Sequence, residues 1–161
     1  MRENAGCSYK LHFWSLILCA CCLLGLLGCQ STNKSASSSF ASIEIRNKNP
    51  IQIREAALAV FHDHGYKAPV ATLAKMVFEK EGTSMDNAAY GNWMGGTPVW
   101  IRVKVKVLPV AENVYGLECL AFYVRDKGRA AFEEEVKMSN LRGRPYQKLL
   151  EQVAQRLDTA Q

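Results

Sequence analysis

One stretch of alternating residues, Val99 to Leu108, constrains the fold more than any other part of this sequence. Every second position from Val99 to Val107 is valine or isoleucine, and the positions between them are aromatic or cationic: Trp100, Arg102, Lys104 and Lys106. Successive side chains of a strand point to opposite faces, so this pattern predicts a strand with one buried and one wet face. Other elements of the chain must cover the valine face.

Two amphipathic helices are available to cover it. The first has strong start signals, because Asn49 can cap, Pro50 suits the first helical position and Gln52 completes a capping-box spacing. Gly65 can end that helix in the left-handed conformation. The second helix begins at Pro145 and has one continuous apolar stripe: Tyr146, Leu149, Leu150, Val153, Ala154 and Leu157.

Further strands are predicted on both sides of the alternating stretch. They cover 40–45, 74–79 and 115–125, and the last is apolar on both faces, which favours a central place in the sheet. Pro109 is expected to end the alternating strand. The stretch 132–138 fits either a last strand or a helical turn, because Glu134 interrupts its apolar face.

A short helix is expected between Ser84, as its cap, and Gly91, followed by a loop over 92–98. These elements together predict an α+β domain over 43–161. We expect a two-layer sandwich: a mainly antiparallel or mixed sheet of three to five strands, with the two amphipathic helices packed on one face.

The N-terminal part has a different pattern. Arg2 and Lys10 precede an apolar run from Leu11 to Leu27, a layout typical of a secretory leader. The run ends in Leu26-Leu27-Gly28-Cys29, which resembles the lipobox of bacterial lipoproteins. In that family the box cysteine takes a diacylglyceryl group on its thiol, and the leader is cut just before it.

The resemblance implies a signal peptide over 1–28, then the lipidated Cys29 and a serine-rich tether over 29–42. It also implies a lipid anchor in the cell envelope. If the bacterium has two membranes, Gln30 resembles the outer-membrane class, with the domain facing the periplasm. The alternative is an uncleaved signal anchor in which Cys29 is an ordinary cysteine.

The net charge and the cysteine content of the chain after its leader limit the kinds of partner that we expect. Without Arg2, Glu3 and Lys10 the formal net charge falls from +5 to +4, which is not typical of a nucleic-acid-binding protein. After the leader only Cys29 and Cys119 remain, so no disulfide is expected in the domain. The partners we expect are the membrane, through the lipid on Cys29, and an envelope protein or anionic envelope polymer.

The search for catalytic groups gives weak candidates. Cys119 lies in an apolar strand and is interpreted as a buried, inert thiol. His62 and His64 are two positions apart on a helix and point in different directions, which does not fit a metal site. The acidic run 133–135 is interpreted as a solvated face, and no cofactor motif is present.

The binding hypothesis rests on six residues: Tyr90, Trp93, Trp100, Arg102, Lys104 and Lys106. Aromatic and cationic side chains near a glycine-rich loop suit contacts with proteins or anionic polymers. Two alternatives remain, since lysines also keep exposed strands soluble and aromatics can close the end of a core. We therefore expect a non-catalytic binding or assembly module, with a hydrolase or other envelope enzyme that uses an unrecognised site as the alternative.

Overall fold

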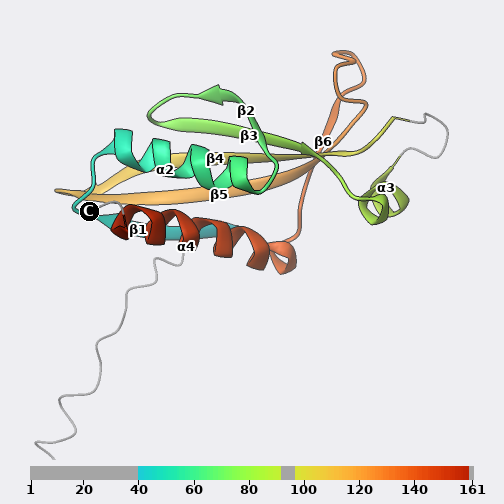
Figure 1. Ribbon diagram of the computed structural model, residues 1–161. Helices are drawn as coiled ribbons and strands as arrows, with labels where there is room; N and C mark the ends of the chain where they lie inside the picture. The colour runs from blue at the N-terminus through green and yellow to red at the C-terminus, as the bar shows by residue number, and fades with distance from the viewer. Residues whose placement is uncertain (1–39, 92–96, 160–161) are drawn as a thin grey trace, which may run out of the picture. The chain divides into compact units, whose positions relative to one another are not determined.

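The computed structural model describes residues 40–91 and 97–159, which belong to one compact unit, Ser38–Gln161. Its elements follow one another along the chain as shown in Figure 1. They are β1 (Ala41–Arg46), α2 (Pro50–Asp63), β2 (Lys67–Ala71), β3 (Lys75–Glu81), α3 (Ser84–Tyr90), β4 (Trp100–Ala111), β5 (Val114–Arg125), β6 (Glu134–Lys137), the 3-10 helix η2 (Asn140–Arg142) and α4 (Arg144–Thr159).

The strands form one antiparallel sheet in the order β1-β5-β4-β3-β2, with β6 also paired to β5. The predicted central place of β5 is confirmed, because β5 pairs with β4 on one side and with β1 and then β6 on the other. The α+β class and the antiparallel sheet are therefore confirmed. The expected three to five strands are wrong, since the described residues form six.

Besides the short 3-10 helix η2, strand β2 is an element that the sequence did not predict. All five of its residues are exposed, and it contains Pro69. Proline donates no backbone hydrogen bond and is tolerated mainly in edge strands, which is the position of β2 next to β3. A fully exposed edge strand needs no alternation of apolar residues, so the sequence pattern contains no signal for it.

Two boundaries differ from the sequence prediction, and one open alternative is settled. Strand β4 continues through Pro109 to Ala111, where a register shift opposite β5 accommodates the proline. Thr83 caps α3 in place of Ser84, and it exchanges capping-box hydrogen bonds with Asp86. The ambiguous stretch near the C-terminal helix is a strand, β6, rather than a helical turn.

Helix α2 begins and ends as the sequence predicted. The Asn49 side chain accepts from the backbone N–H of Gln52, whose side chain accepts in return from Asn49 N–H, so the capping box is confirmed. Gly65 has a φ of +80°, the left-handed conformation expected of it. Neither α2, α4 nor any other helix within residues 40–91 and 97–159 is long and apolar enough to cross a bilayer.

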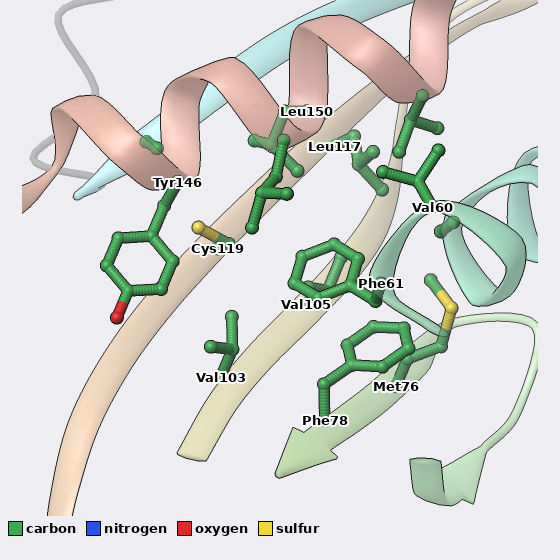
Figure 2. Packing of buried hydrophobic residues seen from close by; sticks show 14 of the residues in the cluster. Val60, Phe61, Met76, Phe78, Val103, Val105, Leu117, Cys119, Tyr146 and Leu150 are labelled. Carbon is green, nitrogen blue, oxygen red and sulfur yellow. The ribbon is translucent and has the colours of Figure 1, made fainter. Parts of the chain in front are cut away.

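The core lies where the buried residues of α2 and α4 meet the valine face of the sheet (Figure 2). Phe61 of α2 stacks on Phe78 of β3, with ring centroids 4.1 Å apart. Leu150 of α4 is fully buried in the same cluster as Val103 and Val105 of β4. The alternation of apolar and polar residues over 99–108 thus directs the valines of β4 toward the two long helices, α2 and α4.

Polar contacts hold α4 against the edge strand β1. The Gln147 side-chain amide accepts from Ser42 N–H at 3.1 Å and donates to Ser42 C=O at 3.2 Å, so it occupies backbone groups of that edge. At the other end of α4, the Lys48 ammonium is 8% exposed and donates to Leu157 C=O at 2.8 Å. A cation there complements the negative end of the helix dipole.

Replacing Lys48 by methionine tests that contact. Lys48→Met keeps the length of the side chain but leaves the last turn of α4 without its donor, so we expect a loss of about 1–2 kcal/mol of unfolding free energy. Lys137→Met, at an exposed lysine of β6, is the matched control and should change stability by less than about 0.5 kcal/mol. Equal denaturation midpoints for both variants would show that the contact contributes nothing.

Candidate functional site

The sheet face opposite the core carries four of the six predicted binding residues. Trp100, Arg102, Lys104 and Lys106 alternate with the buried residues of β4 and therefore share this outer face. Arg102 is paired in register with Glu79 of β3 and with Phe122 of β5. The helices α2 and α4 lie on the other face, so these side chains are outside the core (Figure 1).

Arg102 is the centre of an ion-pair network on this face. Its guanidinium donates to Glu79 at 2.5 Å, to Glu133 at 2.7 Å and to Glu135 at 2.5 Å. Glu135 also accepts from Lys104 at 2.5 Å. The side chains of Arg102 and Glu79 are only 16% and 9% exposed. Arg102 and Lys104 are thus neutralised by carboxylates, and Lys106 is the exposed cation of the predicted stripe.

The acidic run 133–135 is not a uniformly solvated face, and that interpretation is wrong for two of its residues. Glu133 and Glu135 turn toward the sheet, with side chains 25% and 28% exposed. Glu134 points the other way, is 60% exposed and pairs with Arg125 at 3.3 Å. The period-two alternation of a strand places every second glutamate over the outer face, where Arg102 attracts it.

The network shifts the ionisation of its members toward the charged forms. Burial acts to raise the pKa of Glu79, but the hydrogen bonds and charges of Lys127 and Arg102 outweigh burial and hold this pKa below its usual value. The pKa of Glu135 is lowered in the same way, against burial, by Lys104 and Arg102. Burial also opposes the charge on Arg102, yet the three carboxylates raise its pKa.

Trp100 lies at a hollow between β2 and the turn after β5. The hollow has a volume of about 420 Å³ and six lining residues: Lys67, Ala68, Pro69, Glu79, Trp100 and Lys127. The Lys127 ammonium lies 3.4 Å from the centroid of the Trp100 ring and 2.6 Å from a Glu79 oxygen. The hollow therefore combines an aromatic side chain, a proline and two lysines.

The structure separates Tyr90 from the other predicted binding residues. Tyr90 ends α3 and stacks on Tyr123 with ring centroids 4.0 Å apart. Tyr123 is a buried residue paired with Ile101, so it belongs to the core face of β5. Tyr90 packs there and does not join Trp100. Trp93 and Cys29 lie outside the described residues.

The candidate catalytic residues do not form a site. Cys119 is a free thiol, 1% exposed, and burial raises its pKa to about 12, so its interpretation as a buried thiol is confirmed. His62 and His64 are exposed, and His64 Nε2 lies 2.7 Å from Gln152 Oε1. Within the part of the chain that the structure describes, no three His, Cys, Asp or Glu residues gather as a metal site.

Arg102→Gln should destabilise the domain. It leaves Glu133 with only its hydrogen bond from Gly128 N–H, and it weakens the pairing of Glu79 and Glu135. We expect a loss of about 2 kcal/mol, because Arg102 and Glu79 at the centre are mostly shielded from water. The outer members, Glu133 and Glu135, are more exposed and contribute less. Lys106→Gln, on the same strand face but exposed, is the control and should cost less than about 0.5 kcal/mol. Denaturant unfolding at pH 7 measures both.

The same pair of variants gives a pH test. The carboxyl pKa values are lowered in the folded state, so their stabilisation is complete above the unfolded value of about 4.3. It is lost as the pH falls through the lower folded values. The stability of the native sequence should therefore fall between about pH 5 and pH 3, and that of Arg102→Gln should fall less. Parallel pH profiles would contradict the network.

Comparisons with known proteins add little. No family model and no curated protein matches this sequence. Among solved structures, the chain is similar to the adenylate sensor from AMP-activated protein kinase in complex with 5-aminoimidazole-4-carboxamide 1-beta-D-ribofuranotide. That likeness has a TM-score of 0.43 and 11% identity, and it covers 73% of this chain and 94% of that chain. A likeness of this degree carries no inference about a ligand.

Proposed function

We propose that this protein is a lipid-anchored protein of the bacterial envelope whose domain acts as a non-catalytic binding or assembly module. The anchor is Cys29, and the proposal for it is supported by the leader and by Leu26-Leu27-Gly28 before that cysteine. In a bacterium with two membranes the location is the outer membrane, with the domain facing the periplasm. In this proposal the domain is a two-layer sandwich. Helices α2 and α4 form one layer and cover the core face of the sheet, so the outer face of the sheet is open for contacts.

The observation that carries the binding function is the hollow beside Trp100. An indole ring, a proline and aliphatic lysine stems give a partner apolar surface to cover, and two ammonium groups lie at the same place. Trp is among the residues that contribute most to protein contacts. The contact surface we propose consists of Trp100, Lys67 and the exposed Lys106, with Arg102 and Lys104 holding the face in shape.

The partner is an envelope protein or an anionic envelope polymer. Arg102 and Lys104 are already paired with carboxylates, so the exposed lysines of this face are the cations that can meet an anionic partner. They are Lys67, Lys75, Lys106 and Lys137. Their charge sets the rate and salt dependence of the encounter, and Trp100 supplies most of the affinity.

The lipid anchor is tested by intact mass and peptide mapping of the protein made in its native host. The mature chain should begin at Cys29, with a mass increment for a diacylglyceryl group on its thiol. Cys29→Ala should leave the leader uncleaved, because the box cysteine is the lipid acceptor. A native chain that keeps Met1, or an unmodified Cys29 at the N-terminus, would refute the anchor.

The contact surface is tested by capture of envelope components on the immobilised protein. Trp100→Ala should weaken capture about tenfold or more, which corresponds to the loss of one important aromatic contact. Phe132→Ala removes an aromatic ring that is 72% exposed but does not line the hollow, so it is the matched control and should leave capture unchanged. Equal capture by the two variants, with both folded, would exclude the hollow.

A further inference from the structure

Two large apolar side chains protrude almost fully from one end of the domain. Leu141 in η2 is 95% exposed and Met85 in α3 is 80% exposed. The residues that follow them in the sequence connect η2 to α3, because the Arg142 guanidinium lies 3.8 Å from an Asp86 carboxylate oxygen. The Arg142 guanidinium also lies 5.3 Å from the centroid of the Tyr90 ring at the end of α3. The two segments that carry Met85 and Leu141 are therefore in contact at this end of the domain.

Core packing does not explain why α3 carries Met85. No residue of α3 is buried. Tyr90 packs the end of the helix on Tyr123, and polar contacts hold the rest of it. These are the capping box at Thr83, and Asn87 Oδ1, which accepts from Val99 N–H at 2.6 Å. A single exposed apolar residue is ordinary, and two that are this strongly exposed on adjoining short turns are the observation from which we infer a contact surface.

The charge beside these side chains is positive. Arg142 is 48% exposed, and Arg144, two residues further, is also exposed. Two carboxylates lie near this surface, and both are engaged. Asp86 is 15% exposed and contacts Thr83 and Arg142, and Glu134 pairs with Arg125, which also donates to Tyr90 C=O. Exposed apolar side chains beside arginines suit the interface of a bilayer, where they can contact acyl chains and anionic head groups respectively.

The chain also enters the domain at this end. Phe40, the first described residue, packs its ring 5.2 Å from that of Tyr146 in the first turn of α4. Its carbonyl is so close to Gly143, which directly follows η2, that a Cβ there would lie 2.5 Å away. Cys29 precedes Phe40 by 11 positions, so at most ~40 Å of chain can separate the two residues.

We propose that Met85 and Leu141 form a membrane-docking surface that inserts into the head-group region of a bilayer, with Arg142 and Arg144 at anionic lipid head groups. This inference rests on the proposed function for the membrane anchor, which keeps the domain within reach of the lipid. Protruding side chains on short turns suit a fluid interface, where no preformed pocket has to receive them.

The test uses the full chain, purified from its host and reconstituted into vesicles of phosphatidylethanolamine and phosphatidylglycerol. A nitroxide is placed at Leu141→Cys or, as the matched control, at Val110→Cys, which is 57% exposed in the β4–β5 hairpin at the far end of both strands. Accessibility to oxygen and to a water-soluble nickel chelate then reports the depth of each label. The buried Cys119 does not compete for the reagent.

We expect the label at 141 to gain oxygen accessibility and to lose nickel accessibility about fivefold or more relative to the label at 110. Vesicles of phosphatidylcholine alone, or the double variant Arg142→Glu and Arg144→Glu, should weaken this protection because they remove the charge attraction. Water-like accessibility at both positions would overturn the proposal. Shielding of position 141 that persists without lipid and grows with protein concentration would overturn it too, since it assigns the surface to a second copy or another protein.

The depth measurement serves either anchor once labelling of other cysteines is subtracted. An uncleaved chain would keep Cys7, Cys19, Cys21 and Cys22 and a free Cys29 thiol, so the same chain without an introduced cysteine is labelled as a blank. A chain held by an uncleaved leader is also confined to the vesicle surface, and mass spectrometry of the same sample identifies the anchor. A failed lipidation with a protected label at 141 would refute the proposed lipidation but keep the docking surface. The converse result would keep the lipid anchor and exclude docking.

Discussion

The long pairing between β4 and β5 is the constraint on which the rest of this structure depends. Each strand has 12 residues, and the pairing extends from Trp100 opposite Val124 to Ala111 opposite Val114. A shift of one residue would exchange the two faces of β4. The valines would then leave the core, and Arg102 would enter it without its partners. Burial of a charged guanidinium without carboxylates is expensive, so the ion-pair network and the core favour the same register.

The outer face also depends on that register, because Arg102 joins parts of the chain that are far apart. It links β3 through Glu79 to the segment before β6 through Glu133. Glu79 in turn holds Lys127, and Lys127 covers the ring of Trp100. The charges that resemble a binding stripe in the sequence therefore act first as a scaffold. The aromatic hollow depends on that scaffold for its shape.

The sequence predicted those features that depend on short-range periodicity. The two faces of β4, the capping box at Asn49 and the apolar stripe of α4 are local patterns, and the structure confirms each of them. Strand β2 and the role of Lys127 could not be predicted in this way. The first is an exposed edge without a pattern, and the second depends on contacts across 48 positions of sequence, with Glu79 as the partner.

The candidate site shows the same limit. Alternation correctly placed Trp100 and Arg102 on one face, but it gave no information about which carboxylates would meet Arg102. Tyr90 was grouped with Trp100 because they lie near each other in the sequence. In the structure a helix end and a strand start separate them, since α3 packs toward the core face through Tyr123. Proximity along a loop is weak evidence for a shared surface, because the loop can cross from one face of a sheet to the other.

Because Tyr90 and Trp100 are separated, they belong to different surfaces in our two proposals. Tyr90 lies under Arg142, beside the apolar tips Met85 and Leu141, and so belongs to the surface that we assign to the bilayer. Trp100 lies on the opposite face of the sheet, beyond β4. We infer that the two proposed surfaces do not compete. The bilayer would meet the end of the sheet that carries α3 and η2, while a partner would meet the outer face beside Trp100.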